Sequence, residues 1–233
     1  MILADFLRAL RQLPDPAFRR VLLLGLALTL ALLVAIYALF LGAIQMLTPE
    51  TVEIPLVGPV GGLDTLLSWG SLLFMIGLSI FLMVPVASMF TGFFLEDVAA
   101  AVEARHYPDL PPVPKVSLYE SVKDSVNFFA VLIAVNVVAL VLAVFAGPFV
   151  PVVFWVVNGF LLGREYFTLA AMRRLGRAGA RALRARHPVA IWVAGILMAV
   201  PLSVPLVNLF IPLLGAATFT HLFHRLNGTA ARG

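Results

Sequence analysis

The sequence has no cysteine, and only 12% of its residues are charged. Without cysteine the chain can form no disulfide, no thiolate nucleophile and no cysteine-ligated metal site. Average soluble chains carry about 25% charged residues, a much larger share. Because 62% of the residues are hydrophobic, a soluble domain of this length could not bury so much apolar surface. The composition therefore indicates an integral membrane protein.

Sequence motifs typical of hydrolases, metalloproteases and nucleotide-binding proteins are also missing. The chain has no GxSxG, no HExxH and no glycine-rich phosphate loop. These absences argue against an enzyme, and we expect neither catalytic residues nor a cofactor. His221 and His224 lie three residues apart and could form a metal pair, but no third ligand is near them in the sequence. Two interfacial histidines at a helix end, with no metal, are the favoured interpretation.

Unbroken apolar runs, rather than alternating ones, predict α-helices that cross the membrane. Two runs, residues 18–47 and 65–95, exceed the about 20 residues that a transmembrane helix needs and predict two long transmembrane helices. Before them, residues 1–13 place apolar side chains at helical spacing and charged side chains on the opposite face. That pattern predicts an amphipathic helix lying at the membrane surface.

Two further apolar runs are broken by proline and glycine. Residues 125–163 are interrupted by GPFVP, and residues 188–220 by Pro201 and Pro205. The halves of the second run are too short for two spans of about 20 residues each, and basic sequence flanks both runs. We predict two helical hairpins that enter and leave on the same side. The chain would then be an all-α integral membrane protein, a single membrane domain over residues 1–233, with two long transmembrane helices and two partly penetrating hairpins.

Lysine and arginine are absent from one hydrophilic loop, residues 48–64, and present in every other hydrophilic segment. Positively charged loops stay in the cytoplasm, so we expect both termini there and this loop on the opposite side. The formal net charge of +4 then belongs to cytoplasmic loops rather than to a nucleic-acid surface. The basic run at residues 173–187 is best interpreted as a cytoplasmic helix near anionic membrane lipid.

Arg19 and Arg20 follow a proline turn at the start of the first long run. Pro16 suits the first turn of a helix, and Asp15 suits its N-cap. The first amides of a helix lack intrahelical acceptors and lie at the positive end of its dipole. Together with two guanidinium groups they could bind an oxyanion. From these residues alone an anchor at the cytoplasmic surface is favoured over an anion site, and the Asp15 carboxylate opposes an anion.

Polar residues punctuate the later apolar runs and their ends. Glu96 follows the second run, Asn127 lies inside the third, and Arg164 and Glu165 follow it. Charged groups at membrane depth are costly and often functional. These residues could line a pore or form a polar network, and a purely structural ion pair or interhelical hydrogen bond is an equal alternative.

Four segments resemble the bacterial CysZ sulfate permeases, within a wider family that includes the eukaryotic etoposide-induced membrane protein. They are PAFRRV, FTGFFLEDV, NGFLLGREYF and VNLFIPLLGAATFTHLFHR, in the same order as in the family. The resemblance implies sulfate uptake through the bacterial inner membrane for cysteine synthesis, by a homodimer or higher homo-oligomer. It also places a sulfate site at Ala17, Phe18, Arg19 and Arg20. Family members usually have glycine at the position of Ala17 and no acid at that of Asp15.

We therefore expect a permease or channel for sulfate-like oxyanions, with passive flux because the sequence has no nucleotide site. The alternative is a non-transporting membrane scaffold or biogenesis protein, in which the polar groups only join helices. The packing of Glu96, Asn127 and Arg164 distinguishes the two functions. A wet cavity around them favours transport, and dry mutual pairing favours a scaffold.

Overall fold

The computed structural model describes residues 2–47, 51–54, 58–61, 69–77, 79, 86, 94–113, 134–135 and 137–229. Most of these residues are helical, and one pair of short strands interrupts the helices. The prediction of an all-α membrane protein is confirmed at the level of fold class. Asn127 and most of the predicted transmembrane helix at 65–95 lie outside the described residues.

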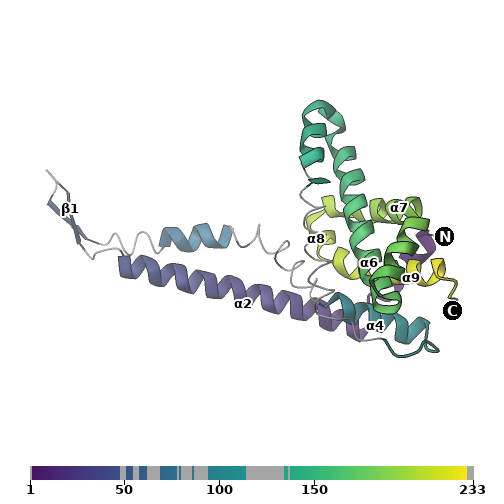
Figure 1. Ribbon diagram of the computed structural model, residues 1–233. Helices are drawn as coiled ribbons and strands as arrows, with labels where there is room; N and C mark the ends of the chain where they lie inside the picture. Colours follow the sequence, from purple (N-terminus) through teal and green to yellow (C-terminus); the bar gives the residue numbers. More distant parts are fainter. Residues whose placement is uncertain are drawn as a thin grey trace.

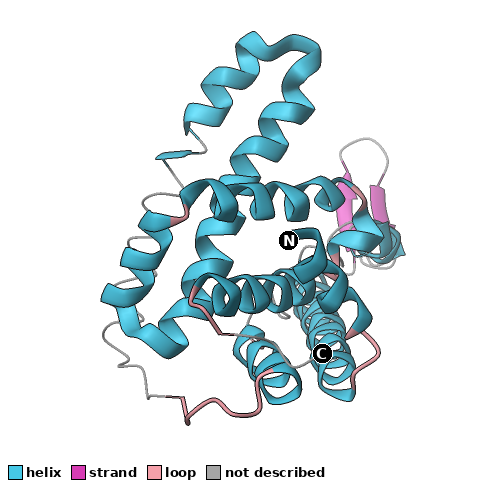
Figure 2. Ribbon diagram, turned by 90° about the vertical axis from the view of Figure 1, so that its right-hand side faces the viewer, coloured by secondary structure: helices cyan, strands magenta, loops and turns pink. Residues whose placement is uncertain are grey.

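Two helices open the chain, α1 (Ile2–Arg11) and α2 (Pro16–Leu47). α2 begins at Pro16. Proline predicts a helix start because amides in the first turn have no intrahelical acceptor, so the hydrogen that proline lacks is not needed there. Its segment Pro16–Ala43 is long and apolar enough to cross a membrane. Figure 1 shows α2 extending away from the other labelled helices. The strands β1 (Thr51–Ile54) and β2 (Gly58–Gly61) follow it as an antiparallel hairpin, drawn in magenta in Figure 2.

The exposed surfaces of α2 and of the helix at 137–146 are strongly apolar. Leu39 is 75% exposed and Phe145 is 83% exposed, with many leucine and valine side chains beside them. Soluble monomers rarely expose contiguous apolar patches of this kind. A second segment, Val137–Arg186, also contains a stretch that is long and apolar enough to cross a membrane. Both surfaces suit contact with lipid.

The chain reverses direction between residues 137–146 and α6 (Val150–Arg186). The 3₁₀ turn η1 (Gly147–Phe149) connects the two helices, and Gly147 has a φ of 50° that favours glycine. Figure 1 shows the two helices side by side at the top of the view. The turn lies in GPFVP, where proline and glycine predict a break.

A second reversal occurs inside α6 and differs from the prediction of one basic helix over 173–187. Gly176 has φ 65° and ψ −176°, a conformation essentially restricted to glycine. Beyond it the chain folds back, as shown by a hydrogen bond in which Arg184 Nη1 donates to Thr168 Oγ1 at 2.7 Å. In a straight helix these two residues would be about 24 Å apart, at about 1.5 Å per residue. The single glycine therefore brings the basic segment back beside the first half of α6.

The last part of the chain is a proline-broken pair of helices. α7 (Pro188–Ala199) leads through η2 (Val200–Ser203) and α8 (Pro205–Asn208) into α9 (Ile211–Leu226). Neither α7 nor α9 continues through the prolines, because proline lacks the amide hydrogen that a helical hydrogen bond requires. α9 contacts α1, α6, α7 and α4 (Leu95–His106), and its residues from Ile211 to His224 are all buried. α9 is thus the centre of the helical core.

α6 and α7 approach each other closely at three glycines. Gly159 and Gly163 lie one turn apart on α6, and Gly195 faces them from α7. A Cβ atom on Gly195 would lie 1.9 Å from the carbonyl oxygen of Gly159. Small residues spaced four apart let membrane helices pack with their backbones in near contact. The GFLLG segment carries this spacing in the sequence, a signal that the prediction of the hairpins did not use.

Candidate functional site

The predicted oxyanion site lies at the start of α2. Arg19 and Arg20 are exposed and line an open hollow of about 490 Å³ together with Pro16 and the next apolar turn of the helix. Within the described part of the chain, neither guanidinium group forms a hydrogen bond or an ion pair. Both arginines therefore keep their full hydrogen-bonding capacity for a solute, a lipid or a residue that the structure does not describe.

Asp15 occupies part of the same helix start. Its Oδ1 accepts a hydrogen bond from the Ala17 amide at 2.9 Å, which is the N-cap interaction that its position predicts. Its Oδ2 lies 3.3 Å from Arg105 Nη1 on α4, so a neighbouring cation balances its charge. The Ala17 amide is consequently occupied by the protein itself. The Phe18 side chain is fully buried and serves the core.

The predicted polar network is distributed over two places. Glu96 is exposed, and its backbone carbonyl accepts a hydrogen bond from Arg173 Nη1 at 2.9 Å. Arg164 is partly buried and lines a separate pocket, and Glu165 is exposed. Among the described residues no hydrogen bond or ion pair joins Glu96 to Arg164 or Glu165.

A buried polar network forms instead around Glu103 on α4, and we call it the Glu103 network. Glu103 is 5% exposed. Its Oε2 accepts from Arg174 Nη2 at 2.7 Å and from Arg173 Nη2 at 3.2 Å, and its Oε1 accepts from Arg174 Nε at 3.0 Å. His224 Nε2 lies 3.1 Å from the same Oε1. One carboxylate thus joins α4, α6 and α9.

The charges around Glu103 fix its protonation state. Burial alone would raise its pKa, but hydrogen bonds from His224 and Arg174 and the positive charges of Arg173 and Arg174 lower the pKa to about 2. The carboxylate therefore remains ionised at any physiological pH. A buried carboxylate with this many partners is well satisfied, because both oxygens accept charge-assisted hydrogen bonds.

The two histidines of HLFH each have a different hydrogen-bond partner. Tyr107 stacks on His224 with ring centroids 4.1 Å apart, and its hydroxyl lies 3.0 Å from His221 Nδ1. Burial, followed by the charge of Asp5, raises the pKa of Tyr107 to about 12, so the hydroxyl keeps its proton and donates it. Burial, followed by the charge of His106, lowers the pKa of His221 to about 3, so His221 is neutral and accepts. Among the described residues no group of three potential ligands could hold a metal.

The two ends of the chain meet beside this network. Asp5 on α1 is 1% exposed, and its Oδ2 accepts from Arg225 Nη2 at 2.7 Å and from Arg225 Nε at 2.9 Å. α1 turns its buried Asp5 and Ala9 toward the core and leaves Leu3 and Leu7 exposed. The amphipathic helix thus keeps an apolar face on the outside. In Figures 1 and 2 the N- and C-termini lie on the same side of the molecule.

Comparison with known families identifies the chain. Residues 5–212 match the model of the EI24 family, described as Sulfate transporter CysZ/Etoposide-induced protein 2.4. The chain belongs to the EI24 family. No curated protein matches it. The family description indicates a sulfate-transporter-like membrane protein, as the resemblance of the four sequence segments implied.

The Glu103 network is the part of this EI24-family chain that sequence reasoning missed. Glu103 stands in EDVAAAVEARH, where it resembles any charged residue on an amphipathic helix. Glu103 lies four residues, about one turn, after Ala99, so the two share a face of the helix, and Ala99 is buried. An acid among buried positions requires a cationic partner. The basic pair Arg173 and Arg174 was the available candidate.

Proposed function

We propose that this protein is a permease or channel for sulfate-like oxyanions in the bacterial inner membrane, supplying sulfate for cysteine synthesis as a homodimer or higher homo-oligomer. The observation that carries the proposal is the pair Arg19 and Arg20 at the start of a helix, without partners among the described residues, in a chain of this family. We propose no enzymatic activity for the protein.

The start of α2 has the features that an oxyanion site requires. Arg19 and Arg20 offer planar donor groups that match the oxygens of a tetrahedral anion. The helix dipole adds a partial positive charge at the same end. The ion pair with Arg105 offsets the negative charge of Asp15, which would otherwise repel an anion at this helix start. Because Asp15 already binds the Ala17 amide, we assign binding chiefly to the two guanidinium groups, with the Phe18 amide as the backbone contribution.

We expect the double change Arg19→Gln, Arg20→Gln to weaken sulfate binding at least about tenfold. A hydrogen bond to a charged group contributes about 1.5–3 kcal/mol net, and about 1.4 kcal/mol corresponds to a tenfold change in affinity. The measurement is calorimetric titration of detergent-solubilised protein with sulfate, with chloride as the control anion. If neither the native protein nor the variant gives sulfate-specific heat, the arginines are a membrane anchor only.

Asp15→Asn provides the matched variant in the same titration. Asparagine is as good an N-cap as aspartate, so the helix start is preserved. The change removes a negative charge beside the site and frees Arg105 from its ion pair. Sulfate binding should become tighter, and the gain should be larger at low salt because the interaction is partly exposed. Weaker binding in this variant would contradict an anion site at the start of α2.

We also propose that both termini and the basic segment after Gly176 are cytoplasmic, with residues 48–64 on the periplasmic side. The distribution of lysine and arginine supports this topology, as does the ion pair between Asp5 and Arg225, which holds the first and last helices together. A cysteine introduced at the exposed Ala182 should react with membrane-impermeant maleimide only from the cytoplasmic side. The chain has no native cysteine to compete, and labelling from the periplasm would refute the topology.

One observation favours the alternative function of a membrane scaffold. The Glu103 network is buried and mutually paired, which is the arrangement expected of groups that only join helices. Radiolabelled sulfate uptake into liposomes containing the purified protein separates the two functions. Uptake above that of protein-free liposomes supports transport, and its absence with correctly folded protein supports the scaffold.

A further inference from the structure

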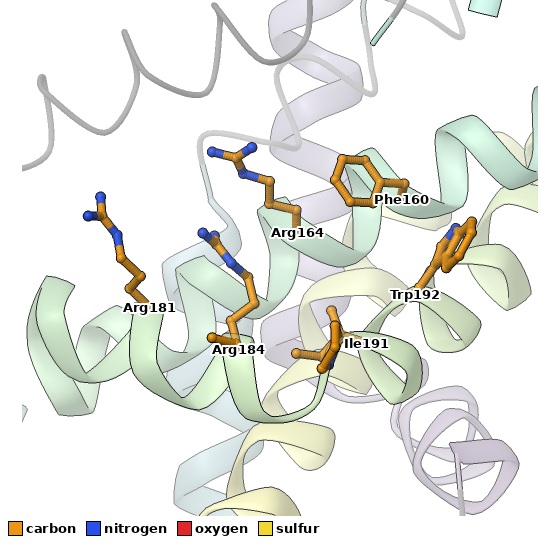
Figure 3. Close-up of a pocket in the computed structure, with 8 residues that line it drawn as sticks. Phe160, Arg164, Arg181, Arg184, Ile191 and Trp192 are labelled. Atoms are coloured by element: carbon orange, nitrogen blue, oxygen red, sulfur yellow. The ribbon is translucent and has the colours of Figure 1, made fainter.

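We propose that a second site, distinct from the start of α2, binds the phosphate group of an anionic phospholipid. The site is a pocket of about 230 Å³ between the two halves of α6 and the beginning of α7. We call it the three-arginine pocket, after Arg164, Arg181 and Arg184, which line it together with Phe160, Ile191 and Trp192. Figure 3 shows the three arginine side chains extending in a similar direction from the two halves of α6, with Phe160 and Trp192 to their right.

The reversal at Gly176 is what assembles these arginines. Arg164 precedes the glycine, whereas Arg181 and Arg184 follow it and return alongside the first half of α6. The hydrogen bond from Arg184 to Thr168 holds the returning segment in place. The fold therefore brings together three like charges that a straight helix would keep apart.

The pocket has positive charge, and none of the described residues that line it could neutralise that charge. Among these lining residues there is no aspartate and no glutamate. Within the described part of the chain, the guanidinium groups of Arg164 and Arg181 form no ion pair and no hydrogen bond. Gathered cations repel one another, and an anion between them removes that cost. Phosphate oxygens match the planar fork of arginine, so a phosphate group is the chemistry that the cluster suits best.

The apolar wall of the pocket distinguishes a lipid from a free anion. Phe160, Ile191 and Trp192 line it beside the arginines, and the Trp192 indole is fixed by a hydrogen bond from Nε1 to the Val156 carbonyl at 2.9 Å. A small inorganic anion gains nothing from such a wall. A phospholipid presents a charged phosphate next to hydrocarbon, and basic pockets between membrane helices at the cytoplasmic side bind such headgroups.

The position along the chain agrees with a site at the membrane boundary. Arg164 directly follows the apolar run at 125–163, and Pro188 in the pocket wall opens the run at 188–220. The pocket therefore lies where both apolar segments give way to basic sequence. This inference depends on the membrane placement of the two hairpins and is independent of sulfate transport.

Trp192 supplies a direct readout of lipid in the pocket. In a Trp69→Phe, Trp155→Phe background Trp192 is the one remaining tryptophan, since the chain has three. Phosphatidylglycerol with brominated acyl chains, titrated into detergent micelles of this protein, should quench Trp192 at lower mole fraction than brominated phosphatidylcholine. Adding Arg164→Gln and Arg181→Gln should raise the required mole fraction of phosphatidylglycerol about tenfold or more, because each basic residue near the membrane surface adds to the attraction of an anionic lipid.

The control variant carries Arg11→Gln and Arg186→Gln, two exposed arginines outside the pocket, and should retain the preference for phosphatidylglycerol. Arg181→Gln alone is a milder variant if the double change impairs folding. Equal quenching by both lipids, or equal loss in the control variant, would overturn the proposal.

Displacement of the lipid by millimolar sulfate or glycerol phosphate would assign the pocket to a free oxyanion instead. Sulfate calorimetry on the Arg164, Arg181 variant should match the native protein, which separates this site from the one at Arg19 and Arg20.

Discussion

Glu103→Gln is expected to destabilise the folded protein by about 3–5 kcal/mol, the range found when one partner of a buried ion pair is removed. The change leaves Arg173 and Arg174 with no carboxylate at distances of 2.7–3.2 Å, while both remain largely buried. Glutamine retains the shape but supplies an amide group that donates toward cations. Denaturant unfolding in detergent micelles, followed by circular dichroism, measures the loss.

Glu96→Gln is the matched control for this change. Glu96 lies on the same helix but is exposed, and its contact with Arg173 uses the backbone carbonyl, which the substitution preserves. Its effect should stay within about 0.5 kcal/mol, as for most surface substitutions. Equal destabilisation by the two variants would show that the Glu103 network contributes no special stability.

The pH dependence of unfolding provides a second check on the same network. The unfolded chain protonates Glu103 near its ordinary pKa of 4.5, whereas the folded chain does so only near 2, so this stability is full above pH 4.5 and is lost as the pH falls toward 2. His221 acts earlier, because the unfolded chain protonates it near 6.5 and the folded chain near 3. The native protein should weaken below pH 6.5 and weaken further below 4.5. The Glu103→Gln variant should lack much of the second loss.

Gly195→Leu is expected to prevent α7 from docking on α6. Even the first added atom, Cβ, would lie 1.9 Å from the Gly159 carbonyl oxygen and 2.8 Å from the Gly163 amide nitrogen. These are backbone atoms, so no side-chain rotation relieves the overlap, and the helices must separate. Overpacking typically costs about 1–3 kcal/mol and occasionally more. We expect a cost above this range, visible as loss of the monodisperse peak in size-exclusion chromatography and a lowered unfolding midpoint.

Gly42→Ala tests the opposite sign. Gly42 lies in α2, and a Cβ atom there would meet nothing within 4 Å. Alanine in a helix interior is about 0.5–1 kcal/mol more favourable than glycine, so this variant should be as stable as the native protein or more so. If Gly195→Leu behaves like Gly42→Ala, the close approach of α6 and α7 is wrong.

The features that depend on local chemistry were predictable from the sequence. Composition alone gave the membrane class, and Pro16 marked the start of α2 because proline is tolerated only where no amide partner is needed. The occupation of the Ala17 amide could also have been foreseen, since an N-cap aspartate binds the amide of the second or third helical residue. Whether Arg19 and Arg20 bind sulfate stays a prediction.

The features that depend on tertiary packing were not predictable. Glu103 meets Arg173, Arg174 and His224 across 70, 71 and 121 residues of sequence, and no local pattern specifies such pairs. Gly176 and Gly179 look alike in RRLGRAGAR, yet only Gly176 takes a positive φ and reverses the chain. That reversal, rather than any motif, brings Arg181 and Arg184 to Arg164.

The ion pair between Asp5 and Arg225 can form only after the ribosome has synthesised α9. The two residues are 220 positions apart, and at about 5–20 residues per second the second appears about 10–45 s after the first. During that interval the Asp5 carboxylate has no Arg225 to bind, and the exposed leucines of α1 favour the bilayer surface. Synthesis of the last helix then supplies both the Arg225 guanidinium and the buried surface of α9 against which α1 packs. The first helix made is therefore one of the last to reach its final place.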